Sequence, residues 1–169
     1  MTLISILRRI ALAFAFVVGA GTVGFAQSTA VSLGVQNHDA TSPVEISAEE
    51  LSVDQASSQA SFKGGVLVRQ GDLTMACDAM TVEYGPDENG ADEIKVIRMT
   101  GGVTFASPSE TAESQNAVYN LKTEIITMTG SVLVTQGVTA LSSDKLTYNL
   151  QSGDGLMEGN VKTVLQGNN

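Results

Sequence analysis

The sequence contains no tryptophan and has only one cysteine, one histidine and three prolines among its 169 residues. The single cysteine, Cys77, cannot form an internal disulfide, and a free thiol in an oxidising compartment is usually safe only when buried. The single histidine, His38, leaves no Ser-His-Asp arrangement to assemble, so no catalytic residue and no enzymatic activity are expected. With few large rings, the interior should consist mainly of Val, Ile, Leu and Met, which favours a thin or hollow layered structure.

Basic residues are also scarce, because the chain has 9 Lys and Arg against 18 Asp and Glu. Two of the arginines, Arg8 and Arg9, lie near the N-terminus, and no basic patch is left in the rest of the chain. This argues against binding to nucleic acid or to an anionic membrane surface. One acidic cluster lacks the spacing of an EF-hand loop and is interpreted as solvated turn residues, so neither a metal nor a cofactor is expected: Asp87, Glu88, Asp92 and Glu93.

Residues 1–26 have the pattern of a secretory signal peptide. Arg8 and Arg9 precede an apolar run that ends at Phe25, and small residues stand where a signal peptidase cleaves, at Gly24 and Ala26. The alternative is an uncleaved membrane anchor, but an apolar run of about 16 residues is short of the roughly 20 that a spanning helix needs. We therefore expect the chain to be exported and the first 26 residues to be removed.

The rest of the chain alternates between apolar and polar residues. Residues 27–42 are polar and weakly patterned and are predicted to be a flexible N-terminal arm. From Pro43 onward, apolar residues such as Val44 and Ile46 alternate with polar ones, and this period of two recurs along the chain. Helical spacing is not sustained anywhere. The pattern predicts an all-β fold of half-buried strands.

A short Gly-x-Val element recurs along this alternating region. It belongs to a strand–turn–strand–strand unit that repeats roughly every 29 residues, and an extended turn around Asn89-Gly90 lengthens one interval. Glycine before each valine should relieve crowding at a bend or bulge. Since one unit cannot bury its apolar face alone, four stacked copies should form a repeat-built, twisted antiparallel sheet with one apolar face inward. The four elements are Gly64-Gly65-Val66, Gly101-Gly102-Val103, Gly130-Ser131-Val132 and Gly159-Asn160-Val161.

Five stretches of the alternating region are Pro43 to Leu51, Phe62 to Gly71, Leu73 to Tyr84, Met128 to Val132 and Ser143 to Tyr148. Together they resemble the lipopolysaccharide-transport bridge proteins of the LptA (OstA-like) family. The match lies in their order and spacing over nearly all of residues 43–165 more than in any one of them. We therefore interpret residues 43–167 as an OstA-like β-jellyroll domain of four repeats.

The resemblance implies a V-shaped antiparallel sheet, a β-jellyroll or taco, whose apolar interior holds the acyl chains of lipopolysaccharide. It implies a periplasmic location and protomers that join head to tail into a homo-oligomer. It also implies partners at the two membranes, an inner-membrane anchored LptC-like protein and an outer-membrane LptD-like translocon. The positions that match the lipid-contacting residues of the family are Val44, Ile46, Phe105, Tyr119 and Leu121. The charged C-terminal tail of many members is absent, because the sequence stops at Asn169.

Two functions remain open from the sequence. The first is a lipid-carrying bridge, because an apolar trough gains about 25 cal/mol per Å² of surface removed from water and needs no charged clamp. The alternative is a structural or adhesive β-solenoid that has a filled interior and binds partners on its outer face. In either case an unclosed sheet has two edges, which invite strand addition. We expect residues 44–48 to form one edge and residues 156–165 the other.

Overall fold

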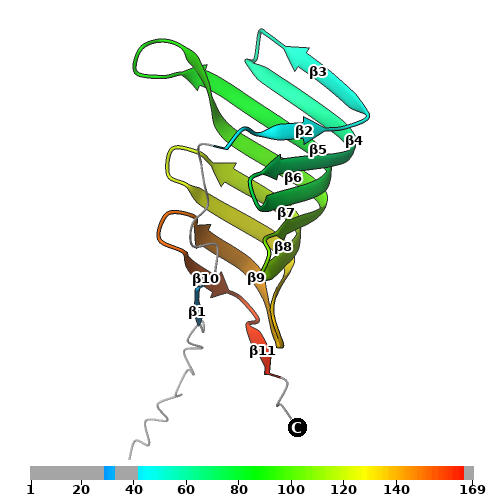
Figure 1. Ribbon diagram of the computed structural model, residues 1–169, viewed down its shortest axis with the longest axis vertical. Coiled ribbons are helices and arrows are strands. Elements are labelled where there is room, and N and C mark those ends of the chain that lie inside the picture. The colour runs from blue at the N-terminus through cyan, green and yellow to red at the C-terminus, as the bar shows by residue number, and fades with distance from the viewer. Residues whose placement is uncertain (1–28, 33–41, 166–169) are drawn as a thin grey trace, which may run out of the picture.

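The computed structural model describes residues 29–32 and 42–165, and every regular element in these ranges is a β-strand (Figure 1). None of their segments forms a helix that is long and apolar enough to span a bilayer. The strands belong to one 11-stranded sheet in which every pair is antiparallel. They are β1 (Thr29–Ser32), β2 (Glu45–Ser47), β3 (Glu50–Asp54), β4 (Gln59–Gln70), β5 (Leu73–Pro86), β6 (Asp92–Ala106), β7 (Glu110–Asn120), β8 (Ile125–Gln136), β9 (Thr139–Asn149), β10 (Asp154–Glu158) and β11 (Lys162–Leu165).

The long strands β4 to β9 bend near their middles. Three of the Gly-x-Val elements lie at such bends, in β4, β6 and β8, and the fourth lies between β10 and β11. The pairing register shifts between Lys63 and Val66 in β4, and equivalent shifts occur in the following hairpins. The first glycine of each element has a positive φ, as at Gly64 and Gly101. A Cβ there would collide with a side chain of the preceding part of the sheet, Glu49 for Gly64 and Asp78 for Gly101. The prediction that these glycines relieve crowding at a bulge is therefore confirmed.

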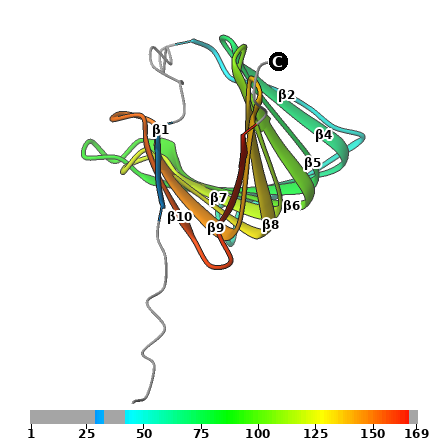
Figure 2. The same ribbon diagram turned by 90° about the horizontal axis from the view of Figure 1, so that it is seen from below.

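The bends divide the sheet into two wings, and the wings face each other as a V (Figure 2). Wing A contains β3, β10 and the segments 59–63, 79–86, 92–100, 116–120, 125–129 and 145–149. Wing B contains β2, β11 and the segments 66–70, 73–77, 103–106, 110–114, 132–136 and 139–143. The predicted fold, an all-β antiparallel sheet folded into an open V, is confirmed.

The two edges of the sheet are built alike. At the N-terminal edge, β3 pairs with the wing A part of β4 and β2 with its wing B part. At the C-terminal edge, β10 pairs with the wing A part of β9 and β11 with its wing B part. The edge expected at residues 44–48 is present as β2, next to β3. The expected edge at residues 156–165 is only partly right, because β1 covers β10 and leaves β11 as the open part.

The N-terminal segment also differs from expectation. Residues 27–42 were predicted to be a flexible arm, but Thr29–Ser32 forms β1 and pairs with Asp154–Met157 of β10. The physical reason is that β10 offers unpaired backbone groups along its outer side, and a short segment that contains Thr and Val readily adopts the extended conformation. The expected signal peptide, residues 1–26, lies outside the described residues.

Candidate functional site

The inner face of the V is mainly apolar. Alternating positions of every long strand point into the space between the wings, and most of them are nearly inaccessible to solvent. The pairing registers align these positions into rows that cross the sheet. One row of wing A begins at β3, ends at β10 and consists of Leu51, Phe62, Met80, Met99, Ala117, Met128, Leu146 and Met157.

Methionines are concentrated in this row. Met80 and Met99 pair directly across β5 and β6, and Met128 and Met157 occupy the same row further along the sheet. All four are at most 2% exposed. Methionine is unbranched and polarizable and adapts to irregular apolar surfaces, so a row of methionines can repack around a variable apolar partner.

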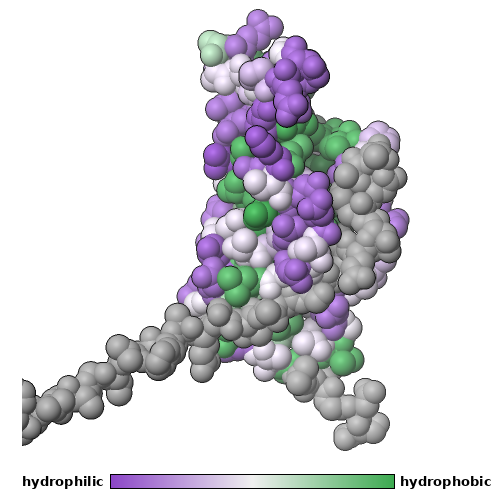
Figure 3. Space-filling model, turned by 90° about the vertical axis from the view of Figure 1, so that its left-hand side faces the viewer, coloured by the Kyte–Doolittle hydropathy of each residue, from purple (hydrophilic) through white to green (hydrophobic). Residues whose placement is uncertain are grey.

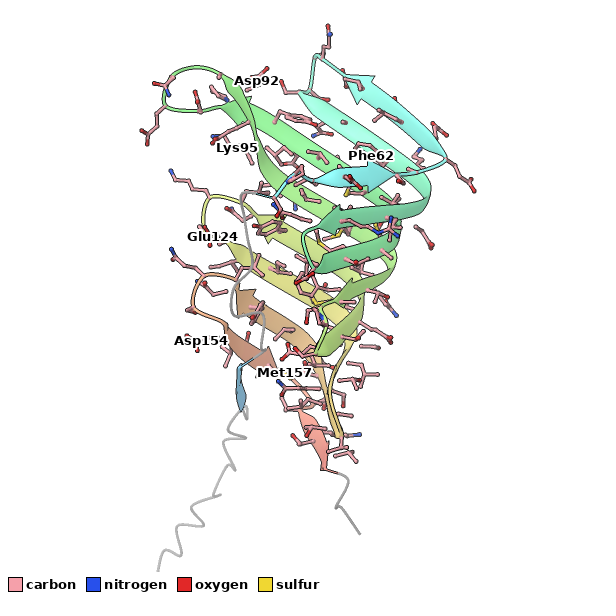
Figure 4. The ribbon with its side chains drawn as sticks, in the orientation of Figure 1. Phe62, Asp92, Lys95, Glu124, Asp154 and Met157 are labelled. Atoms are coloured by element: carbon pink, nitrogen blue, oxygen red, sulfur yellow. The ribbon has the colours of Figure 1, made fainter. Side chains whose placement is uncertain are left out.

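The inner face is closed in its middle and exposed at its N-terminal end. In the middle, Val82 and Val134 have no exposed surface. On β3, Leu51 and Val53 occupy inner positions opposite Phe62 and Ala60, yet they are 58% and 65% exposed. In Figure 4, Phe62 lies toward this end of the sheet and Met157, which is fully buried, toward the other. The V therefore presents an accessible apolar surface at the end where β2 and β3 lie.

The structure brings together only some of the five predicted lipid contacts. Ile46 and Phe105 lie in one row of wing B, separated by two residues of β4 and β5, and Val44 is 44% exposed just before β2. Tyr119 lies in wing A, in the row that begins at Val53. The accessibilities differ widely, because Phe105 is only 7% exposed whereas Ile46 and Tyr119 are half-buried.

Leu121, the fifth predicted contact, is partly buried and packs against the same apolar cluster as Ile46 and Tyr119. It follows β7, and its backbone N–H donates to the carbonyl of Lys95. Together with Ile94 it lines a groove of about 780 Å³ under the β5–β6 turn, whose rim carries the charged side chains of Lys95 and Lys122. Lys95 also forms an ion pair with Glu93. On the face shown in Figure 3, hydrophobic side chains are visible among hydrophilic ones.

Two inner-face residues were missed by the sequence reasoning. Leu51 and Val53 are the large apolar residues of β3 and both are exposed. From the sequence, Leu51 was included only as the end of a family-like stretch, and Val53 was not singled out. The alternation of these two apolar residues with the polar Ser52 predicts that their side chains point to the inner face. The solvent exposure of Leu51 and Val53 could not be predicted in this way, because it depends on β3 being the last strand of wing A.

Small polar residues line the inner side of the bends. Ser114 Oγ donates to the carbonyl of Asn116 and Ser143 Oγ to that of Lys145, both at 2.9 Å. The thiol of Cys77 makes the equivalent contact with the carbonyl of Ala79 at 3.3 Å. Burial raises the pKa of the Cys77 thiol, so this cysteine behaves as a buried structural group and not as a nucleophile.

Titratable groups on the inner face are few. Burial is the main cause of the raised pKa of Tyr119, and the nearby carboxylate of Glu124 adds to it, so this phenol stays neutral. Within residues 29–32 and 42–165, no group of three or more His, Cys, Asp or Glu side chains is placed to hold a metal ion. Glu110 is also buried on this face, where its carboxylate accepts a hydrogen bond from Gln136. The inner face is thus mainly apolar and suited to contact with hydrocarbon.

Comparison with known proteins agrees with this geometry. Residues 45–154 match the family described as LptA/(LptD N-terminal domain) LPS transport protein. An uncharacterized protein of Rhizobium meliloti (strain 1021) is 30% identical over 88 residues, which cover 50% of this chain and 47% of that protein. The crystal structure of LptH, the LptA-homologous periplasmic component of the lipopolysaccharide transport device of Pseudomonas aeruginosa, superposes with a TM-score of 0.67 at 17% identity, over 78% of this chain and 100% of that one.

Proposed function

Because the chain belongs to the LptA/LptD N-terminal domain family of lipopolysaccharide transport proteins, we propose that it is a periplasmic bridge protein that carries lipopolysaccharide from the inner to the outer membrane. The activity is binding and passage of a lipid, with no bond made or broken. The family is one of transport proteins, which supports a non-enzymatic role.

The observation that carries this proposal is an apolar inner face that is accessible at one end. Leu51 and Val53 expose apolar surface that lies in the same rows as the buried residues of the middle. Acyl chains that cover such surface gain about 25 cal/mol per Å² removed from water. Because the interior is mainly apolar, recognition of the acyl chains rests on shape and on apolar area.

The closed middle of the V sets a condition on this binding. Phe105 is 7% exposed and Met99 1% exposed, so an acyl chain reaches them only if the wings separate. In the long strands the wings are joined at bends where the ladder of pairs is interrupted, and glycines lie at the bends of β4, β6 and β8. These bends are the natural places for the angle of the V to change. We propose that lipid enters at Leu51 and Val53 and that the wings open as it advances.

The same proposal includes the location, the partners and the domain boundaries. A signal peptide at residues 1–26 delivers residues 43–167 to the periplasm as one β-jellyroll domain. There the open edges meet an LptC-like protein at the inner membrane and an LptD-like translocon at the outer membrane, or further copies of the chain arranged head to tail. Strand addition at unpaired edges is the physical basis of each contact.

Site-specific photo-crosslinking tests the lipid contact. A photoreactive residue at Leu51, Val53 or Phe105 should yield adducts with lipopolysaccharide in cells. Matched controls are Ser52 and Thr104, which lie on the same strands but point to the outer face. Adducts at the inner positions and not at the outer ones support the bridge. Adducts with protein or glycan at the outer positions alone would instead support the adhesive module with a filled interior.

A further inference from the structure

The wing A edge at the C-terminal end of the sheet is already occupied by a strand from the same chain. β1 pairs with β10 along four positions, from Thr29 opposite Met157 to Ser32 opposite Asp154. In Figure 1 the blue β1 lies beside β10 at the lower end of the molecule. No such extra strand lies on β3 at the N-terminal edge in the part of the chain that the structure describes.

The direction of β1 is that of β3. From β10 through β9, β8, β7, β6, β5 and β4 to β3, every neighbouring pair is antiparallel, so β3 runs opposite to β10. β1 also runs opposite to β10. A second copy stacked in the same orientation would therefore place its β3 on β10 with the direction that β1 has now. β1 occupies the place that this strand needs.

The register matches position by position. The wing A row that starts at Leu51 ends at Thr29, and the row that starts at Val53 ends at Val31. The row between them starts at Ser52 and ends at Ala30.

The residue types in these rows also correspond. Thr29-Ala30-Val31-Ser32 in β1 parallels Leu51-Ser52-Val53-Asp54 in β3. Val31 corresponds to Val53 and the small Ala30 to the small Ser52, whereas Thr29 and Ser32 stand where β3 has Leu51 and Asp54. Four residues in β1 compare with five in β3, so the two strands cover a similar length of edge.

We propose that β1 is an internal cap that imitates β3 and competes with the β3 strand of a second copy for the β10 edge. The head-to-tail stacking that it controls rests on the proposed function, whereas the capping itself rests on the observed pairing of β1. An isolated molecule keeps its wing A edge covered and stays soluble. Joining a neighbour at this edge requires β1 to leave, while the wing B edge at β11 stays open throughout.

A disulfide that can be reduced, engineered between β1 and β10, tests whether β1 acts as a cap. Ala30 and Leu156 are directly opposite in the antiparallel pair, where Cα atoms lie about 4.5–5.5 Å apart, a distance that a disulfide spans. The variant is A30C/L156C in a C77S background, prepared from residue 27 onward. A second variant begins at residue 34 and lacks β1. The C77S single variant, with no cysteine, is the control for the oxidising conditions.

Sedimentation measurements over a range of protein concentrations give the dissociation constant for self-association. Compared with the reduced form, the oxidised variant should associate at least about tenfold more weakly, since four cross-strand pairs hold the cap in place. Compared with the same reduced form, the variant that lacks β1 should associate at least about tenfold more tightly. Adding reductant should restore the reduced value, and the control should not respond to it.

If the oxidised, reduced and shortened forms have the same dissociation constant for self-association, whatever its value, the proposal that β1 acts as a cap is wrong. Lipid crosslinking at Val53 is measured on the same variants and reports on the proposed function separately. If the order of association holds but no lipid adduct forms, the cap stands and the lipid-carrying role fails. If lipid adducts form but association does not depend on β1, the lipid-carrying role stands and the cap fails.

Discussion

Replacing Gly101 by alanine is the sharpest test of how the V is made. Gly101 has a φ of 82°, and a Cβ on it would lie 2.6 Å from the Cβ of Asp78, on the neighbouring strand. The next residue, Gly102, has a φ of 63°, but a Cβ on it would meet no heavy atom within 4 Å. The two glycines thus share the left-handed conformation and differ in the space around them.

The magnitudes follow from this difference. A residue with a Cβ in the left-handed region costs about 1–2 kcal/mol. A collision with a Cβ atom cannot be relieved by rotating a side chain, so the strands must shift, at about 1–3 kcal/mol more. Gly101→Ala should therefore lose about 2–5 kcal/mol and Gly102→Ala about 1–2 kcal/mol. The chain contains its own control, because Ser131 and Asn160 stand at the equivalent second positions with φ values of 54° and 47°.

Urea unfolding followed by circular dichroism measures both losses. Gly102→Asn should cost least, since Asn tolerates the left-handed region. Removing the opposing Cβ with Asp78→Gly in the Gly101→Ala background should recover at least about 1 kcal/mol as a coupling free energy. Equal losses at positions 101 and 102, or no coupling with Asp78, would refute the reasoning that close strand approach at the bend demands the first glycine.

Three further results are expected. Cys77→Ser should change the free energy of unfolding by less than about 1 kcal/mol, because Ser114 already fills the equivalent position at another bend. Because burial raises the pKa of the Cys77 thiol, the rate of its reaction with a disulfide reagent should have a pH midpoint above that of a free cysteine. A pH midpoint at or below that of a free cysteine would contradict this. Phe105→Ala should cost about 3–5 kcal/mol in urea unfolding, whereas Val53→Ala, 65% exposed, should cost under about 1 kcal/mol, and similar losses would mean that the middle of the V is not packed. Leu51→Asp should leave the unfolding midpoint nearly unchanged and abolish lipid crosslinking at Val53; undiminished adducts would show that lipid does not enter at this end.

Much of the fold could be predicted because it repeats. The Gly-x-Val elements located the bends, and the alternation gave the direction of most side chains. Glycine marks a bend in the sequence because the backbone there lies too close to the neighbouring strand for a Cβ, as Gly101 does to Asp78. The strand β1 was missed because Thr29-Ala30-Val31-Ser32 is too short to show a period, and its pairing depends on a vacant edge formed by residues more than a hundred positions later.

The candidate site was harder to predict for a related reason. Alternation places Leu51 and Phe105 on the same inner face, yet one is 58% and the other 7% exposed. The difference comes from the order of strands in the sheet, which places β3 last and β6 in the middle. Exposure at the end of a stack is a property of the assembled sheet, and no single strand sequence encodes it.

The two ends of the V are therefore unequal, although the edges share one design. At the end without an added strand, Leu51 and Val53 expose apolar surface; at the end that carries β1, Met157 exposes none. Burial of the exposed apolar surface at Leu51 and Val53 is favourable, and two partners could bury it. One is an acyl chain along the inner face. The other is the uncapped β10 edge of a neighbouring copy, where Met157 would meet Leu51 in the same row. These two events do not exclude each other, because the acyl chain covers side chains and the neighbour pairs with backbone. A stack joined in this way would have a continuous inner row across the junction, so lipid could cross from one copy to the next without leaving an apolar surface.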